Sequence, residues 1–235
     1  MSYVPNKIGI GITTRNRYDV FKNSYQIIKE KSPSDFKIVV VDDASSEIVQ
    51  EATFRFEENV GVATAKNKCF ELLDDCEHIF LFDDDTYPLV EDWWKPYIES
   101  KEPHLMYTFQ NFIGSEIRVD GCEIMYHDEF LIGYSHPRGC LLYFHHKTLE
   151  TIGGMDTDFG KWGYEHLDIS NRIFNAGLTK CRYGDIPNSN TLIFSMDENQ
   201  LVSSSVANSL RGEYIKKYKK LLNENYLTTK YCKYK

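Results

Sequence analysis

The sequence predicts a mixed α/β fold with a mainly parallel sheet flanked by helices. Short apolar runs, rich in β-branched residues, recur at residues 7–14, 36–43 and 78–82, and polar residues close or follow each run. Such runs are typical of strands that are buried on both faces. Segments with a helical spacing of apolar residues separate them, as parallel strands require. With 235 residues and 42% hydrophobic content, the chain can bury a core.

The first half alternates strands with helices. "KIGIGITT" (residues 7–14) is the first expected strand, and "YDVFKNSYQIIKEK" (18–31) follows as a helix that Pro33 stops. "FKIVVVDD" (36–43) is the second strand, and "GVATAKNKCFELLDD" (61–75) places its apolar residues on one helical face. "HIFLF" is the third strand, and a Thr-Tyr-Pro turn is expected soon after it. This order is typical of a doubly wound α/β sheet.

The second half has a different pattern. "SEIRVDGCEIMYH" consists of two alternating runs around Asp120-Gly121, which predicts a hairpin. "CLLYFHH" predicts another strand, and "YEHLDISNRIFNAG" predicts a helix with Gly177 as its C-terminal cap. Residues 196–209 read as a loop that leads into a basic, Tyr-rich helix.

One domain at residues 1–195 and an extension at 196–235 account for these elements, with 1–110 and 111–195 as the two halves of the domain. The six cysteines form no C-x-x-C pair and are interpreted as reduced thiols. No apolar run approaches the roughly 20 residues that a membrane span needs. The first residues lack the pattern of a signal peptide, so a cytoplasmic location is expected.

Polar residues follow all three strands of the first half. Asp83, Asp84 and Asp85 follow the third strand, Asp42 and Asp43 close the second, and residues 13–17 follow the first. Ligands of open α/β sheets bind beyond the carboxyl ends of the strands. Adjacent acids repel one another, and a divalent cation such as Mg²⁺ or Mn²⁺ neutralises them. Alternatively, these acids cap the next helix or form a solvated turn.

The motifs, taken together, carry a family resemblance. "ITTRNRYDVF", "IVVVDDASS", "NVGVATAKN" and "FLFDDDTY" resemble the nucleotide-sugar-binding half of a family 2 glycosyltransferase with the GT-A, Rossmann-like fold. "RGCLLYFHHKTLETIGGMDTDFGKWGYEHLDISNRI" resembles the acceptor-side motif of that superfamily, particularly in β-1,4-galactosyltransferases and polypeptide N-acetylgalactosaminyltransferases. The resemblance covers about residues 8–183. It implies an inverting transfer of a sugar from a nucleoside-diphosphate sugar, a UDP-sugar first, to a hydroxyl acceptor.

The resemblance also assigns the donor site. Asp83 and Asp85 match the outer positions of the D-x-D motif, which holds Mn²⁺ or Mg²⁺ against the donor diphosphate, and Asp84 would lie near the ribose. The other matched donor residues are Thr13, Arg15, Arg17, Asp42, Asp43, Gly61, Lys66 and Asn67. Without the resemblance, Asp42 and Asp43 could cap a helix, and Gly61 could mark a helix entry.

The acceptor-side motif assigns a general base. Glu165, His166 and Asp168 are the candidates, because an acceptor hydroxyl must lose its proton in such a transfer. The sequence departs from the common pattern, since His166 stands where the family usually has the Asp of an E-D pair. Glu165 is our first choice. In the alternative interpretation these acids only favour the helix N-terminus, and Asp168 pairs with Arg172.

Two further features concern the same site. Trp162, Gly163 and Tyr164 suit a stacking platform for a sugar ring, although core packing of the aromatic residues is an alternative. Relatives often supply a His as a third metal ligand, but this chain has no His beyond residue 166. Ser195, Asp197 or water would take its place.

The charge distribution bears on the acceptor. The last 25 residues carry eight Lys or Arg and two Glu, a net charge of +6. Because the whole chain has a net charge of -8, the first 210 residues carry -14. This basic tail suits contacts with nucleic acid or an anionic membrane surface. Alternatively, it is a solvated amphipathic helix that packs Tyr214, Ile215, Tyr218, Leu221 and Leu222 on the domain. The expected acceptors are a glycan or a hydroxymethylated base of phage DNA.

Two other functions compete with this prediction. A nucleotidyltransferase that acts on sugar phosphates would also bind a nucleotide and a metal, but "GITTRNR" lacks the glycine-rich phosphate loop expected after its first strand. A non-catalytic sugar-binding module would not need carboxylates on both sides of a cleft.

Overall fold

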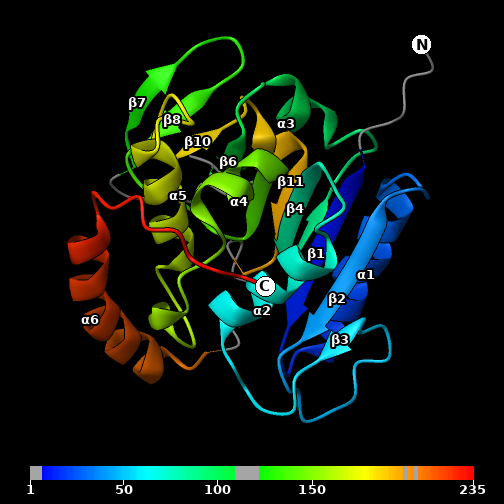
Figure 1. Ribbon diagram of the computed structural model, residues 1–235. Coiled ribbons are helices and arrows are strands. Elements are labelled where there is room, and N and C mark those ends of the chain that lie inside the picture. Colours follow the sequence, from blue (N-terminus) through cyan, green and yellow to red (C-terminus); the bar gives the residue numbers. More distant parts are fainter. Residues whose placement is uncertain (1–6, 109–121, 198–200, 204–205) are drawn as a thin grey trace.

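A six-stranded sheet forms the centre of the molecule (Figure 1). The computed structural model describes residues 7–108, 122–197, 201–203 and 206–235. The strands lie in the order β3 (Phe54–Arg55), β2 (Lys37–Asp42), β1 (Ile8–Thr14), β4 (His78–Asp83), β9 (Leu141–His145) and β6 (His104–Met106). β1 to β4 are parallel, and β9 runs antiparallel to both of its neighbours, β4 and β6. The prediction of a mainly parallel α/β sheet is confirmed.

Helices cover both faces of this sheet. One apolar cluster joins Ile10 and Phe80 of the sheet to Phe21, and the opposite cluster joins Val41 and Leu81 to helices on the other face. The helices are α1 (Tyr18–Lys31), α2 (Val62–Leu72), α3 (Lys95–Glu99), α4 (His146–Ile152), α5 (Glu165–Asn175) and α6 (Asn208–Asn225), and the short 3-10 helices are η1 (Thr157–Phe159) and η2 (Ser189–Thr191). α1 contributes to the first cluster and α2, α4 and α5 to the second.

The alternation of Ile and Gly in β1 has a packing reason. Ile10 and Ile12 point into the cluster with α1, whereas Gly11 faces α2. A Cβ atom on Gly11 would lie 2.7 Å from Cβ of Cys69 in α2 and 2.8 Å from Cδ2 of Leu81. α2 therefore lies too close to β1 for any side chain on that face.

We predict that Gly11→Ala lowers the free energy of unfolding by about 1–3 kcal/mol, because the added methyl group overpacks this contact. Gly212→Ala is the matched control, since nothing lies within 4 Å of a Cβ at this position of α6. The control is expected to leave stability unchanged or to raise it by about 0.5–1 kcal/mol. Urea denaturation measures the free energy of unfolding of both variants. Equal effects of the two substitutions would contradict the packing argument.

Two smaller sheets extend the second half. β7 (Ile124–His127) pairs with β8 (Ile132–Tyr134), which pairs with β10 (Gly184–Asp185). The turn predicted at Asp120-Gly121 lies outside the described residues. The Thr-Tyr-Pro segment is β5 (Thr86–Pro88), a strand paired with β11 (Ile193–Ser195), so the expected turn was wrong. Its backbone is extended because a partner strand more than 100 residues away supplies the hydrogen bonds.

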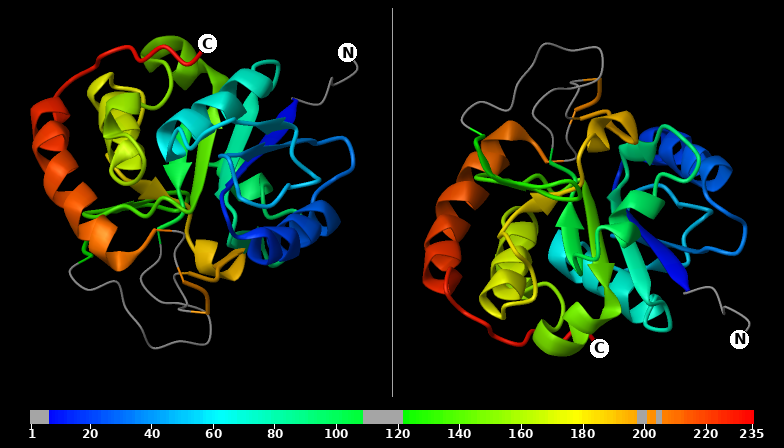
Figure 2. Two further views of the ribbon diagram at one scale, coloured as in Figure 1. Left: turned by 90° about the horizontal axis from the view of Figure 1, so that it is seen from below. Right: turned by 90° about the horizontal axis from the view of Figure 1, so that it is seen from above.

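α6 lies beside α5, on the side of the molecule opposite α1 (Figure 2). Tyr218 is buried against the domain while Lys216, Lys219 and Lys220 are exposed, which agrees with the amphipathic interpretation. Ile215, expected on the packed face, is 44% exposed. After α6 the chain returns to the domain, where the backbone of Cys232 pairs with that of Gly153.

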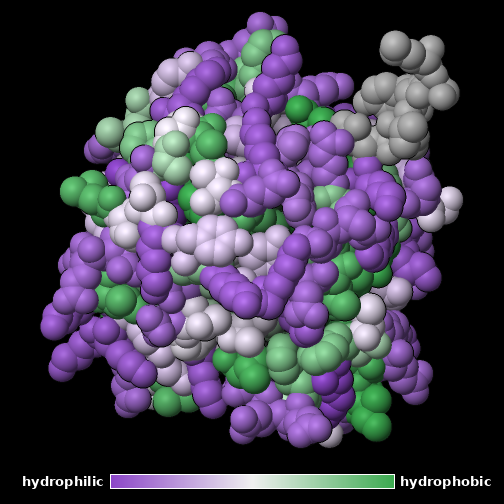
Figure 3. Space-filling view, viewed as in Figure 1, coloured by the Kyte–Doolittle hydropathy of each residue, from purple (hydrophilic) through white to green (hydrophobic). Residues whose placement is uncertain are grey.

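The surface in the view of Figure 3 is largely hydrophilic, and its hydrophobic residues form small separate groups. No helix within the described residues is long and apolar enough to cross a membrane. None of the six cysteines, all of which lie within the described residues, forms a disulfide bond. The prediction for α5 is also confirmed at its end, where Gly177 has a positive φ of 72° and its N–H donates to the carbonyl of Phe174.

Candidate active site

A cavity of about 900 Å³ opens at the carboxyl ends of β1 and β4. The register of the parallel pair sets Thr13 beside Asp83, so the first-strand loop and the acidic triplet meet. Residues from both halves of the domain line it. The predicted residues in its wall are Thr13, Arg15, Arg17, Asp43, Lys66, Asp83, Asp84, Asp85, Trp162, Gly163, Tyr164, Glu165 and His166.

Arg17 holds two of the three adjacent acids. Its Nη1 lies 3.0 Å from Oδ1 of Asp84, and its Nη2 lies 2.8 Å from Oδ2 of Asp85. Thr14 donates its hydroxyl to the other oxygen of Asp84 at 2.8 Å. Burial raises the pKa of Asp84 to about 7 despite the attraction of Arg17. The guanidinium therefore keeps two neighbouring carboxyl groups in fixed positions at the end of β4.

Lys66 of α2 lies between the remaining acid and the second half. Its ammonium is 3.3 Å from Oδ1 of Asp83 and 3.2 Å from Oε1 of Glu165. Burial opposes the charge of Lys66, but the attraction of the two carboxylates is stronger and raises its pKa. Burial also opposes ionisation of Glu165, yet Lys66 and then His166 hold the pKa of that carboxyl below its usual range. Burial raises the pKa of Asp83 to about 6.

Glu165 has one occupied and one free oxygen. It is the first residue of α5, where the helix dipole favours an acid. Its Oε1 contacts Lys66 and, at 3.4 Å, Nδ1 of His166. Its buried Oε2 has no hydrogen-bond partner among the residues that the structure describes. A buried carboxylate oxygen without a partner is costly unless a ligand supplies a donor.

His166 has a fixed position beside this carboxylate. Its ring packs on Gly139, where a Cβ atom would lie 2.8 Å from Cγ of the imidazole. Both residues line the cavity. A glycine is therefore needed at this point of the second half for the ring to lie where it does.

Four predicted residues do not line the cavity. Asp42 accepts a hydrogen bond from the hydroxyl of Ser45 at 2.6 Å and pairs with Arg55. Gly61 touches the backbone of residues 160 and 161. Asn67 donates to the carbonyl of Met155 at 3.0 Å and accepts from its N–H at 2.7 Å. Gly61 and Asn67, expected at the nucleotide, thus attach α2 to the second half of the domain.

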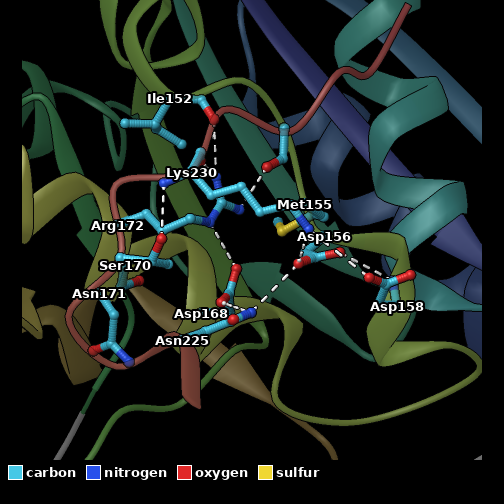
Figure 4. Close-up of polar contacts among 12 residues, drawn as sticks. Ile152, Met155, Asp156, Asp158, Asp168, Ser170, Asn171, Arg172, Asn225 and Lys230 are labelled. Carbon is cyan, nitrogen blue, oxygen red and sulfur yellow. Dashed lines mark hydrogen bonds and ion pairs between the residues drawn. The ribbon is translucent and has the colours of Figure 1, made fainter. Parts of the chain in front are cut away.

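Asp168 is the fourth residue outside the cavity, and it belongs to a buried network around Arg172 (Figure 4). Nε of Arg172 lies 2.7 Å from Oδ2 of Asp168, and both side chains are fully buried. Arg172 also donates to the carbonyls of Ile152 at 2.9 Å and Gly154 at 2.7 Å. Nη1, which donates to Ile152, also lies 3.4 Å from the carbonyl oxygen of Lys230. The structure therefore agrees with the alternative interpretation of Asp168, in which this acid pairs with Arg172.

We predict that Arg172→Met lowers the free energy of unfolding by about 3–5 kcal/mol, because it leaves Asp168 buried without its cation. The control is Lys180→Met, which removes an ion pair from a side chain that is 55% exposed and costs at most about 1 kcal/mol. Urea denaturation compares the two. A loss of 1 kcal/mol or less in Arg172→Met would show that the network is dispensable.

The cavity also contains residues that were not predicted as site residues. Arg138 and Lys161, which lie within the acceptor-side motif, and Arg211 and Tyr214, which lie outside it, line the wall. The guanidinium of Arg211 lies 5.2 Å from the centre of the Trp162 ring, and its Nη2 is 3.7 Å from Oδ2 of Asp197. The only sequence signal for the residues from α6 was the basic composition of the tail. The first turns of that helix thus complete the wall beside Trp162.

The pairing of β5 with β11 brings further oxygen atoms to the acidic triplet. Ser195 lies opposite Thr86, the N–H of Met196 donates to the carbonyl of Asp85 at 2.8 Å, and Ser195 and Asp197 line the cavity. Among the described residues, no group of three or more His, Cys, Asp or Glu side chains forms a complete metal site. Mg²⁺ and Mn²⁺ need only one or two carboxylates when water and phosphate complete the shell. The all-oxygen set around Asp83 and Asp85 fits such an ion, and Lys66 beside Asp83 and Arg17 beside Asp85 already place two positive charges there.

Comparisons with solved structures agree with this fold. GalNAc-T7 with UDP, GalNAc and Mn²⁺ matches at a TM-score of 0.66 and 13% identity, over 93% of this chain and 49% of that one. This chain thus spans about half the length of that relative. The S. aureus TarS fragment 1-349 matches at 0.57 and 11% identity, over 93% and 72% of the two chains. The mannosyltransferase PcManGT from Pyrobaculum calidifontis, with GDP-Man and Mn²⁺, matches at 0.55 and 18%, over 76% and 54%.

Two family models match adjoining parts of the chain. "Glycosyl transferase family 2" matches residues 10–114, and "N-terminal domain of galactosyltransferase" matches residues 123–193. The chain is therefore similar to family 2 glycosyltransferases in its first half and to galactosyltransferases in its second, and it has the fold of the solved glycosyltransferases. None of the curated proteins compared with it matches its sequence. The boundary between the two matched regions falls between the end of β4, where the acidic triplet lies, and the helix that carries Glu165.

Proposed function

We propose that this chain transfers one sugar from a nucleoside-diphosphate sugar to an acceptor hydroxyl, with Mn²⁺ or Mg²⁺ as cofactor. One observation carries the proposal. Asp83 and Asp85 at the end of β4 and the free oxygen of Glu165 at the start of α5 belong to one cavity, and Lys66 links the two sides. The family 2 match supports sugar transfer as the reaction.

The donor would lie on the first-half side of the cavity. Asp83 and Asp85 would hold the metal ion, which neutralises the charge that develops on the leaving diphosphate. Arg15 and Thr13 line the wall where the nucleotide would bind, and Asp43 fixes the neighbouring loop by accepting the N–H groups of Val60 at 2.7 Å and Gly61 at 3.0 Å. The UDP and GDP-Man in related structures support a nucleotide sugar, and UDP-sugars are the first donors to test.

The proposed chemistry is an inverting transfer. The acceptor oxygen attacks the anomeric carbon while the bond from that carbon to the diphosphate oxygen breaks, and the electron pair leaves with the diphosphate. The acceptor proton passes to Oε2 of Glu165, which is ionised and has no partner within the described chain. His166, in contact with the same carboxylate, is the second candidate base.

The acceptor would enter beside Trp162 and Tyr164. Both residues line the cavity, and Arg211 packs over the Trp162 ring, so this wall offers an aromatic face and a cation. A glycan hydroxyl is the acceptor we propose first, and a hydroxymethylated base of DNA the second. The exposed lysines of α6 follow Arg211 on the same helix and would contact an anionic acceptor or surface.

We predict that one nucleotide sugar, in the presence of Mn²⁺, raises the melting temperature of the wild type and is slowly hydrolysed. At a ligand concentration about 100-fold above Kd, the stabilisation is roughly 2.7 kcal/mol. Asp85→Asn is expected to abolish the shift and the hydrolysis. Asp92→Asn, at an acid whose side chain is 61% exposed, is the control and keeps both. If no nucleotide sugar shifts the wild type with either metal, the proposed function is wrong.

We also predict that Glu165→Gln lowers donor hydrolysis by about 10²–10⁴-fold, because a general base contributes this much. Donor binding, measured by calorimetry, is expected to remain. His166→Gln is the comparison variant, and a larger loss there than in Glu165→Gln would assign the base to the imidazole instead.

A further inference from the structure

Lys66 occupies an unusual position for a charged side chain. Its side chain is only 2% exposed, and its ammonium is shared between Asp83, on the side proposed for the donor, and Glu165, on the side proposed for the acceptor. Both carboxylates line the cavity, but the Asp83 side chain is 37% exposed and that of Glu165 only 4%. One buried cation therefore serves two carboxylates, only one of which is open to an incoming ion.

We propose that Lys66 is a positioning residue that couples the two halves of the site: it acts as a resident cation on Asp83, and a divalent cation bound there transfers it to Glu165. The inference rests on the proposed function and assigns Lys66 a role other than direct contact with the nucleotide.

The surroundings of Lys66 restrict how it can respond to an added charge. The next residue, Asn67, is fixed to the backbone of Met155 by two hydrogen bonds, and α2 starts against the backbone of residues 160 and 161. The helix therefore stays in place when the ammonium is repelled from Asp83. Among the described residues, the acceptor that remains in contact with the ammonium is Oε1 of Glu165. A small rotation of the Lys66 side chain is enough to end its contact with Asp83 and keep its contact with Glu165.

The consequence for Glu165 follows from its two oxygens. A stronger contact of Lys66 with Oε1 fixes the carboxylate and leaves Oε2, which has no partner within the described chain, available to the acceptor hydroxyl. Metal loading on one side of the cavity then prepares the base on the other side. The same arrangement makes Lys66 a competitor of the metal ion for Asp83, because like charges repel at close range in a buried site.

The test is the affinity for Mn²⁺ in the absence of donor, measured from the electron paramagnetic resonance of the free ion. Lys66→Met is expected to bind Mn²⁺ about tenfold more tightly, since a competing cation is gone, and to hydrolyse donor more than about tenfold more slowly, since Glu165 loses its support. Lys68→Met, two residues along α2 and paired with Glu71 on the surface, is the control and changes neither. Tighter metal binding together with slower turnover is a result that general damage to the fold would not produce.

A mutant cycle tests whether the effect passes through Lys66. Glu165→Gln is expected to weaken Mn²⁺ binding by about threefold to tenfold, because the ammonium then pairs with Asp83 alone. In a Lys66→Met background the same substitution is expected to have no effect on Mn²⁺ affinity. If Glu165→Gln changes Mn²⁺ affinity equally in the wild-type and Lys66→Met backgrounds, Glu165 acts on the metal directly through space. That result would overturn the coupling role of Lys66.

A second variant covers the case in which Lys66→Met does not fold. Lys66→Arg keeps the charge and is expected to bind Mn²⁺ within about twofold of the wild type. Mn²⁺ affinity that is unchanged or weaker in folded Lys66→Met overturns this inference and leaves the proposed function in place. If neither the wild type nor any variant binds Mn²⁺ or Mg²⁺, the inference falls together with the proposed metal dependence.

Discussion

The two halves of the domain depend on one buried charge. Lys66 reaches from α2 to Asp83 at the end of β4 and to Glu165 at the start of α5, and these contacts span 99 residues of sequence. Burying an ammonium costs free energy unless close acceptors compensate for the lost water. Because both acceptors are carboxylates at the ends of regular elements, the strand and the helix must stay in register for the cation to remain paired.

The backbone around α2 supports that charge. Asn67 binds both polar groups of the Met155 backbone, and Gly61 allows its loop to approach residues 160 and 161 closely. α2 also lies directly on β1, where Gly11 leaves no side chain between them. The helix therefore has a rigid contact on the sheet side and another on the second half, and Lys66 projects from between them. A site built on such fixed elements can hold its charged groups without solvent.

Most of the fold was predictable because its signals are local. The apolar runs of β1, β2 and β4 and the spacing in α1 and α5 are properties of short windows, and the structure confirms them. The pairing of β5 with β11 was missed because Thr86 and Ser195 meet only in the folded chain. Arg211 was missed as a site residue for the same reason, because it reaches the cavity only in the folded chain. The sequence of its helix shows only a basic composition.

The sequence by itself determined the elements and the family resemblance, and it placed carboxylates at the ends of strands, because periodicity and motif spacing are properties of the chain itself. Only the tertiary structure decided which of these groups share a cavity. Glu165 and Asp168 are three residues apart, yet one meets Lys66 in the cavity and the other pairs with Arg172 in a buried network. The physical reason is that a buried charge is placed by the partner that compensates it, and those partners lie on other elements or further along the helix.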